Sequence, residues 1–575
     1  MGNFAGSNIC FGSVLEISVL AQMQASQGPQ RSCSVHKLYN KPMQQVQQNY
    51  TPCRASDNSN YNDGSNSQAQ VSLTTENEKF FTVDTFPATD CAIYDGDPSV
   101  SVSSNRSPFS SQCSQSNMFE QRRSYEKTAG SPVSLCSGVD DSNGKKHELR
   151  ELNNKLLRPE SDIDDSCSCS LNGVVSKHFS LTRRNQVLDV ASRLDLKELL
   201  VACAEAVDEA DTSTAEVLMD ALEKRVSVYG EPMQRLSAYM LEGLRARLLS
   251  SGSNIYKKLK CNEPTSSELL SYMQVLYHIT PYFKFAYMSA NVVISEAMKN
   301  ENRIHIIDFQ IAQGSQWVFL IHYLARRPGG PPFLRITGID DSQSAHARGG
   351  GLQLVGERLA SIAKSCGVPF EFHTAALSGC MVKLENLRVR HGESLAVNFP
   401  YMLHHMPDES VSTMNHRDRL LRLVKSLSPK IVALVEQEMN TNTAPFLPRF
   451  RETLDYHKAI FESVDVTRPR NDMQRIRSEE HCIARDVVNL IACEGADRVE
   501  RHEVFGKWRS RLLMAGFTPC PLSPSVAEAI KVMLKEYSSN YKLAESQGAL
   551  YIGWNNRALA TSSAWQLPHS LPLGS

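Results

Sequence analysis

The first residues that could do chemistry follow an apolar run at 303–309, which the sequence predicts to be a buried strand. Asp308 belongs to this run, and the loop after it carries Gln310 and Gly314. In an open α/β sheet, ligands bind beyond the carboxyl ends of the strands, so a nucleotide or S-adenosylmethionine would bind here. Asp340 lies at the end of the next apolar run, where an acid that binds a ribose belongs. A cofactor cradle needs several glycines so that the backbone can approach the ligand, and this loop has one. The pattern therefore favours a structural turn, and we expect no cofactor.

A second candidate is the pair His404-His405, with Asp408 and Glu409 close behind it. Imidazole and carboxylate groups bind metal ions and transfer protons. Adjacent side chains are expected to point to different sides of the chain, and no third ligand follows at a suitable spacing. The 15 cysteines are scattered without a CxxC pair, as in proteins whose thiols stay reduced. No nucleophile motif of the GxSxG or Cys/His kind is recognisable. The sequence thus predicts no metal site, no catalytic residue and no enzyme.

Basic residues gather between 468 and 485, and such a cluster could bind the phosphates of nucleic acid. Asp472, Glu479 and Glu480 interrupt the cluster, and the formal net charge of the chain is −1. No basic field of the whole chain would therefore draw it to nucleic acid. We expect DNA to be reached mainly through other proteins, with direct binding as the alternative. The basic residues are Arg468, Arg470, Arg475, Arg477 and Arg485.

The segment 196–200 reads Leu-Lys-Glu-Leu-Leu, which is an LxxLL box. On a helix, Leu196, Leu199 and Leu200 share one face and could fill the groove of a partner protein. The same spacing is also that of a helix packed into a core. Both interpretations stay open at this stage.

Residues 1–185 differ in composition from the rest of the chain. They are rich in Ser, Asn and Gln and are broken by turn-forming residues. Such segments bury too little apolar surface to offset the entropy lost on ordering, so we predict a disordered arm. A short helix is expected at 145–157, where leucines recur at helical spacing.

From residue 190 to about 300 the pattern predicts a cap made only of helices. Ser192 or Asp195 could cap the first helix, and Ser213 with Glu216 has capping-box spacing for the second. Pro232 suits the first turn of a third helix. Two further helices are expected at 266–279 and 283–299.

Strands and helices then alternate from 303 to 554. Repeated βα units predict a mostly parallel sheet covered on both faces, and two late strands around one helix allow an antiparallel edge pair. The fold class expected is therefore α/β and Rossmann-like, of the kind found in methyltransferases. No run approaches the ~20 apolar residues that span a bilayer, so no membrane contact is expected. The strands are expected at 303–309, 333–341, 370–374, 395–399, 431–436, near 517 and at 549–554, and the helices at 315–326, 352–366, 417–427, 446–461, 505–515 and 526–536.

The run Ile304-His305-Ile306-Ile307-Asp308 resembles the VHIID core of the GRAS family of plant transcriptional regulators. The resemblance extends over residues 190–566, with a helical leucine-repeat cap about 190–300 and the VHIID region about 273–340. A second leucine repeat follows at about 350–386, the PFYRE region at about 395–490 and the SAW region at about 492–566. Asp486 stands where the family has Glu, which keeps an acid beside Arg485. The remaining residues that match family motifs are Pro400, Arg501, Glu503, Trp508, Trp554, Ser563, Ala564 and Trp565.

The resemblance implies a regulator that binds DNA-binding transcription factors and other GRAS proteins, as a homodimer or heterodimer. It implies the nucleus as the compartment, with the cytoplasm as a second one. The N-terminal arm resembles that of the phytochrome-A-signalling and chitin-inducible gibberellin-responsive branch, and it lacks the DELLA residues. An S-adenosylmethionine-dependent methyltransferase and a direct DNA-binding factor remain the alternative functions.

Overall fold

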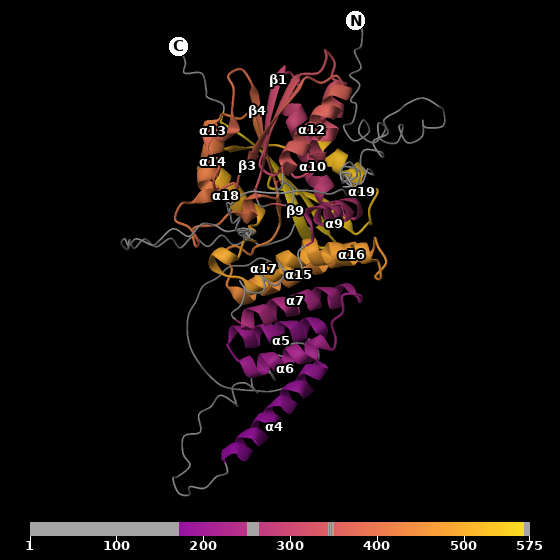
Figure 1. The fold of residues 1–575 in the computed structure, drawn as a ribbon, viewed down its shortest axis with the longest axis vertical. Helices are drawn as coiled ribbons and strands as arrows, with labels where there is room; N and C mark the ends of the chain where they lie inside the picture. Colours follow the sequence, from indigo (N-terminus) through magenta and orange to yellow (C-terminus); the bar gives the residue numbers. More distant parts are fainter. Residues whose placement is uncertain (1–171, 250–263, 343, 345–346, 348–349, 569–575) are drawn as a thin grey trace, which may run out of the picture.

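The computed structural model describes residues 172–568, apart from 250–263, 343, 345–346 and 348–349 (Figure 1). The helix expected at 145–157, and most of the arm expected at 1–185, lie outside these residues. The helix α4 (Asn172–Arg193) crosses the expected boundary of the arm at residue 185. Among the helices that are described, none combines the length and the apolar character needed to cross a membrane.

Nine strands form a single mixed sheet in the order β3-β2-β1-β4-β5-β9-β8-β7, with β6 paired to β9. The strands from β3 to β5 are parallel, and β9, β8, β7 and β6 pair antiparallel. The order 3-2-1-4-5 is that of a Rossmann-like sheet, so the predicted fold class is confirmed. The strands are β1 (Arg303–Asp308), β2 (Phe333–Asp340), β3 (Phe370–Ala376), β4 (Ser394–Pro400), β5 (Ile431–Gln437), β6 (Thr518–Cys520), β7 (Tyr541–Ser546), β8 (Ala549–Trp554) and β9 (Arg557–Gln566).

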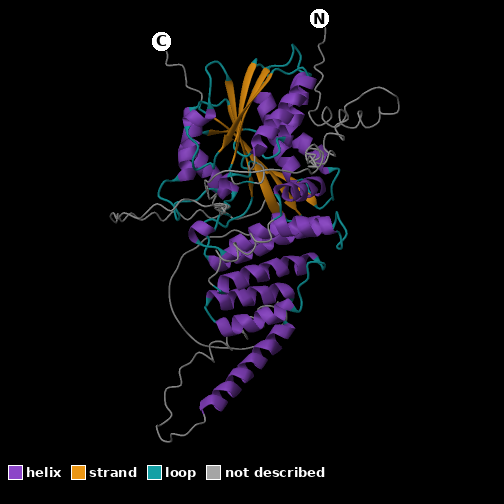
Figure 2. Cartoon of the chain, viewed as in Figure 1, coloured by secondary structure: helices purple, strands orange, loops and turns teal. Residues whose placement is uncertain are grey.

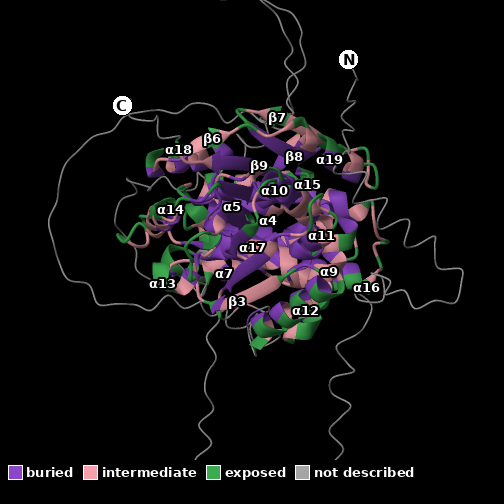
Figure 3. Cartoon of the chain, turned by 90° about the horizontal axis from the view of Figure 1, so that it is seen from above, coloured by how far each residue is buried: buried purple, intermediate pink, exposed green. Residues whose placement is uncertain are grey.

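Helices cover both faces of this sheet, as Figure 2 shows. One face packs against α10 (Tyr282–Ala297), α11 (Ser315–Ala325), α12 (Gly351–Ser365) and α19 (Pro524–Leu534). The other face packs against α13 (Leu384–Leu387), α14 (His416–Ser426) and α18 (Phe505–Ala515). Buried residues gather along the strands and the inner sides of these helices, with exposed residues outside (Figure 3). The central parallel strands are apolar on both faces because both are covered.

The antiparallel half of the sheet is larger than the sequence predicts. The two late strands expected near 517 and at 549–554 are present as β6 and β8, but they do not pair with each other: both pair with β9, which was missed, as was β7. The sequence of β9, RALATSSAWQ, is made largely of small and polar residues, so it carries no apolar run. Eight of its ten residues are nevertheless buried, because β9 lies between β5 and β8. Its position in the sheet, and not its composition, makes it a core strand.

The helical cap also differs from the contiguous unit expected at 190–300. Its core joins α5 (Leu196–Asp208), α6 (Thr212–Glu223) and α7 (Pro232–Leu248) to α15 (Phe446–Asp465) and α17 (Ala484–Ala492), which come much later in the chain. Figure 1 shows α7, α5, α6 and α4 stacked in that order below α15 and α17. The expected cap helix 283–299, observed as α10, covers the sheet instead. The helix α9 (Ser266–Ile279) packs against α16 (Met473–Ser478).

Local capping is confirmed for one cap helix and wrong for the next. Asp195 caps α5, and its side chain accepts from the Glu198 backbone N–H at 2.7 Å. Glu198 in turn accepts from the Asp195 backbone N–H at 2.9 Å, which completes a capping box. The second helix begins at Thr212 and not at Ser213, because Asp211 accepts from the Thr214 N–H at 3.1 Å. An acid two residues earlier in the chain thus displaces the predicted cap.

Candidate functional site

Asp308 lies at the carboxyl end of β1, and both its oxygens are used by neighbouring side chains and backbone. Oδ2 accepts from Trp317 Nε1 at 2.7 Å, and Oδ1 accepts from the Gln310 N–H at 3.1 Å and from Asn398 Nδ2 at 3.4 Å. Burial raises the pKa of Asp308 to about 7, and these three donors oppose the rise. Asp308 therefore ties the loop after β1 to α11 and β4.

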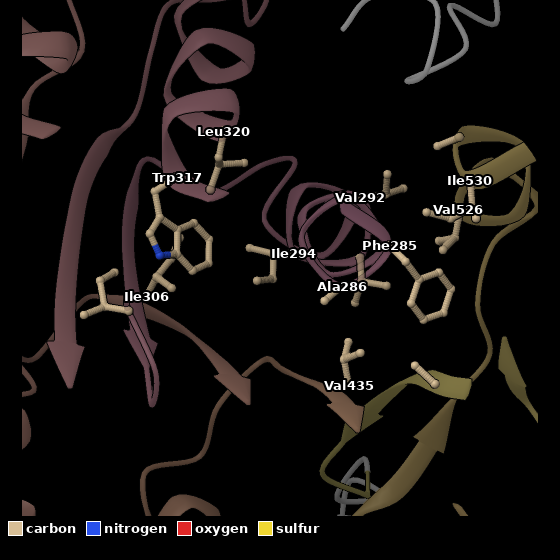
Figure 4. Packing of buried hydrophobic residues seen from close by; sticks show 14 of the residues in the cluster. Phe285, Ala286, Val292, Ile294, Ile306, Trp317, Leu320, Val435, Val526 and Ile530 are labelled. Carbon is tan, nitrogen blue, oxygen red and sulfur yellow. The ribbon is translucent and has the colours of Figure 1, made fainter. Parts of the chain in front are cut away.

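Apolar side chains pack around the loop that follows β1. Trp317 is completely buried in the core between β1 and α10 (Figure 4). Ile311 lies over β2, where a Cβ added to Gly338 would stand 3.0 Å from Ile311 Cγ1. Gly314 has φ of +67°, and a Cβ there would stand 2.8 Å from Val355. The one glycine of the loop thus serves a tight turn packed under α12, and these contacts favour a structural turn over a cofactor cradle.

The four residues expected around a cofactor differ in what they face. Asp340 is buried, and burial raises its pKa to about 6. Of the four, Gln310 alone lines a pocket, which opens between α9, α10 and the end of β4. The pocket is lined mainly by aromatic and amide side chains. Its lining consists of Met273, Gln274, Tyr277, Phe283, Tyr287, Gln310, Ala312, Gln313, Ser315, Pro400 and Tyr401.

His404 and His405 lie in the 3₁₀ turn Leu403–His405 that follows β4, with their ring centroids 4.1 Å apart. Glu500, from the segment after α17, has carboxylate oxygens 3.3 Å from His405 Nδ1 and 3.6 Å from His404 Nε2. His404 Nδ1 donates to Glu436 on β5 at 2.6 Å. His502 stacks on His404 with centroids 4.3 Å apart. The fold therefore brings Glu500, from a distant segment, beside the two histidines, although no third group follows them at a suitable spacing in the sequence.

Burial and neighbouring charges set the protonation of this cluster. Burial, with the charge of His405 second, holds the pKa of His404 well below its usual range, so its ring is neutral. Burial opposes protonation of His405, but Glu500 outweighs it and raises the pKa of His405 to about 9. Burial likewise opposes ionisation of Glu500, but the surrounding histidines hold its pKa well below the usual range. The cluster therefore contains a His405–Glu500 ion pair beside a neutral His404.

Asp408 and Glu409, expected near the two histidines, pair with arginines instead. Arg501 Nη1 lies 3.2 Å from Asp408, and both side chains are buried. Arg511 lies 3.0 Å from Glu409 and 2.8 Å from Glu503. These pairs hold the segment after α17 against the end of β4 and against α18, so they have a structural role.

The profile of the GRAS domain family matches residues 196–566. The chain belongs to the GRAS domain family. It is 54% identical to Scarecrow-like protein 13 of Arabidopsis thaliana, over 95% of this chain and 99% of that protein. It is 60% identical to Scarecrow-like transcription factor PAT1 of Arabidopsis thaliana, over 77% of this chain and 89% of that protein. Chitin-inducible gibberellin-responsive protein 2 of Oryza sativa subsp. japonica is 55% identical, over 84% of this chain and 87% of that protein. Among solved structures, the crystal structure of SCL7 in Oryza sativa is similar to this chain, with 33% sequence identity and a TM-score of 0.57. The match covers 65% of this chain and 100% of the SCL7 chain.

The VHIID segment of this GRAS domain is β1 itself. Ile304, Ile306 and Ile307 are buried in the cores on the two faces of the sheet. His305 accepts from Arg335 Nη2 at 3.1 Å and donates to Thr337 Oγ1 at 2.9 Å. Burial, with the Arg335 charge second, lowers the pKa of His305 to about 3, so the ring is neutral. These contacts bind β1 to β2 and leave the motif no free polar group at the surface.

The three C-terminal tryptophans of the GRAS domain are buried in its cores. Trp508 stacks with the Arg417 guanidinium 5.1 Å from its ring, and Trp554 Nε1 donates to Glu462 at 3.1 Å. Trp565 Nε1 donates to Ser563 Oγ at 3.0 Å.

The other residues that match family motifs also lie within the fold. Ser563 and Ala564 belong to β9 and pair with β5, while Pro400 ends β4. Asp486 lies on α17, where burial, with Glu500 second, holds its pKa well above the usual range.

The LxxLL box of the GRAS domain faces mainly inward. Leu199 and Leu200 are completely buried in the cap core, and Leu196 is half-buried against it. In this arrangement only Leu196 offers part of its surface to a partner. The geometry favours core packing for Leu199 and Leu200, while a role in partner binding stays a prediction.

The arginines between 468 and 485 face acids. Arg468 lies 3.1 Å from Asp472, and Arg477 lies 2.9 Å from Glu480. Arg470 pairs with Asp465 at 3.0 Å and also with Glu231. Arg475 is completely buried and pairs with Glu479, also buried. The charge that could have contacted phosphates is thus largely used within the cap.

Sequence reasoning missed Glu436, Glu500 and His502, which complete the histidine cluster. The only signal available was that Glu500-Arg501-His502-Glu503 places four polar residues in a row after a helix. Such a row is ordinarily assigned to the surface, yet all four residues are buried here. Because valines flank this polar run on both sides, the sequence could also have been interpreted as a buried polar site.

Proposed function

We propose that this GRAS protein is a plant transcriptional regulator that acts in the nucleus by binding DNA-binding transcription factors and other GRAS proteins, without catalysing a reaction. One of its relatives, 60% identical, is named a transcription factor. The observation that carries the non-catalytic part of the proposal is the packing of the loop after β1. Trp317 and Ile311 are buried in the core, and Gly314, the one glycine of the loop, is packed against α12, so the loop lacks the glycines of a cofactor cradle.

Two surfaces support a role in binding partners. The cap helices α4, α5 and α6 lie at the end of the molecule far from the sheet (Figure 1), where a second protein can reach them. The pocket beside Gln310 offers aromatic and amide side chains, including Tyr277 and Phe283, which suit contact with a peptide segment. We therefore assign partner binding to the cap and to the carboxyl edge of the sheet.

A tethering experiment tests the proposal directly. The full chain would be fused to a heterologous DNA-binding domain and expressed in plant protoplasts that carry a reporter with the matching site. We expect the fusion to change reporter transcription several-fold relative to the DNA-binding domain alone, and the untethered chain to have no effect. A fusion that accumulates in nuclei and leaves the reporter unchanged would contradict the proposed function.

Direct DNA binding makes a different prediction for the arginine segment. Changing Arg468, Arg470 and Arg477 together to alanine should leave the affinity for a duplex of mixed sequence unchanged within about twofold, because acids already pair with them. If all three contacted phosphates, their loss would flatten the slope of log K against log salt by roughly 2.7. Fluorescence anisotropy across a salt series measures both the affinity and the slope. A flattening of that size would support direct DNA binding through these three arginines.

The methyltransferase alternative is tested by calorimetric titration of S-adenosylmethionine into the full chain. We expect no heat of binding and no thermal stabilisation at millimolar ligand, because the loop after β1 has a single glycine, at position 314, and that glycine is packed against α12. A methyltransferase titrated under the same conditions serves as the positive control. Binding in the micromolar range would show that the loop opens, and would justify a search for a methyl acceptor.

A further inference from the structure

We propose that His404, His405 and Glu500 bind a divalent transition-metal ion of the zinc class. The three ligand atoms all lie within 4.8 Å of one another. Glu500 is 3.3 Å from His405 Nδ1 and 3.6 Å from His404 Nε2. Zinc–nitrogen bonds are ~2.0–2.1 Å long, so ligand atoms at the corners of a tetrahedron lie roughly 3.3–3.4 Å apart. The two separations, which involve different oxygens of Glu500, are close to this spacing, and the remaining one, at most 4.8 Å, requires the imidazole rings to turn toward the ion.

The ring of His404 is held in the orientation that a metal ligand needs. Its Nδ1 donates to Glu436 at 2.6 Å, which directs the Nε2 lone pair toward Glu500. Glu436 is itself fixed by the backbone N–H groups of Met402 at 3.1 Å and Leu403 at 2.7 Å. A carboxylate behind the histidine is the usual arrangement around metal-binding imidazoles, because it fixes the tautomer and increases the basicity of the ligand.

One oxygen of the cluster lacks the partner that its burial requires. The side chain of Glu500 is only 6% exposed, and its Oε2 accepts no hydrogen bond from any residue that the structure describes. A buried carboxylate oxygen without a partner is costly, and a bound cation would satisfy it.

His502 is a neighbour of the site and not one of its ligands. Its Nε2 lies 3.5 Å from Glu500, but its ring is stacked on His404 with an angle of 21° between the planes. A metal ion must lie close to the plane of each ring that binds it, and two nearly parallel planes cannot share one ion. The fourth position is left to a water molecule, as in open zinc sites. The His405 side chain is 38% exposed and gives the ion access from solvent.

The test uses the full-length protein, freed of metal with a chelator and then titrated with Zn²⁺ in a calorimeter. We expect one ion per chain with a Kd in the micromolar range or tighter, and a rise in Tm when the site is filled. Co²⁺ added in place of Zn²⁺ should give the visible absorption of a site with nitrogen and oxygen ligands. Absence of binding at one ion per chain would overturn the proposal, as would charge-transfer bands from thiolate ligands, which would assign the ion to cysteines.

Matched histidine variants locate the ion. His405→Ala, at a partly exposed ligand, should weaken zinc binding at least tenfold and abolish the rise in Tm, whereas His391→Ala, at an exposed histidine of the β3–β4 connection, should bind as wild type does. Circular dichroism shows whether the variants fold, and His405→Gln replaces His405→Ala if the smaller side chain prevents folding. Equal zinc affinity in the wild-type and His405 variants would overturn the assignment. These measurements concern binding alone, so they do not depend on the proposed function.

Discussion

Arg235→Ala is expected to lower the free energy of unfolding by about 3–5 kcal/mol, because it removes one partner from a buried ion network. The guanidinium of Arg235 is completely buried and donates to Glu479 at 3.1 and 3.2 Å and to Asp465 at 2.6 Å. It also donates to the carbonyl oxygens of Phe461 at 3.2 Å and Gly230 at 3.0 Å. Loss of these contacts leaves Glu479 buried with Arg475 as its remaining cation.

The effect should be concentrated in the cap, because Arg235 on α7 is bonded to the later α15 and to the π-helical turn Glu479–Ile483. Hydrogen exchange of α5, α6 and α7 should accelerate more than that of β1 and β4. Arg245→Ala is the matched control, since Arg245 lies on the same helix and pairs with Glu223 at the exposed surface. Surface pairs contribute little, so its denaturation midpoint should stay close to wild type. Equal midpoints for the two variants would contradict the importance of the buried network.

Trp565→Ala is expected to cost about 3–5 kcal/mol and to lower Tm by roughly 5–10 °C. Trp565 is 1% exposed in the core between the sheet, α14 and α18. It lies on β9, where it pairs with Val432 of β5 and with Pro519 of β6. Because β9 joins the parallel and antiparallel halves of the sheet, a cavity there should weaken both. Partner binding should therefore fall together with Tm.

Two controls separate packing from contact with a partner. Trp565→Phe keeps an aromatic ring in the core and loses the Nε1 hydrogen bond to Ser563, so it should be much less destabilising. Tyr229→Ala removes an aromatic ring that is 58% exposed, and Tm should not change measurably. Thermal unfolding followed by circular dichroism gives the stabilities, and co-precipitation with a defined transcription factor gives the binding. A Trp565→Ala protein of wild-type Tm that no longer binds would make this tryptophan a contact residue only.

The sequence was sufficient for features that depend on neighbouring residues. The apolar runs that became β1, β2 and β5 predicted buried parallel strands, because such strands are apolar on both faces. Asp195 was recognised as a cap because the capping box spans only a few residues. The single glycine at 314 already favoured a packed turn over a cradle, and the contacts of Trp317 and Ile311 support that interpretation.

The tertiary structure alone decided which distant segments meet. The strand β9 is a core strand because β5 and β8 enclose it, although its own residues are small and polar. The cap is completed by α15 and α17, and Arg235 bonds α7 to α15, so the composition of the cap could not be read from the segment 190–300. His404 and His405 acquire Glu436 and Glu500 as neighbours only after folding. Local periodicity and capping determine each helix or strand. The pairing of elements far apart in the chain depends on long-range contacts, which no local pattern encodes.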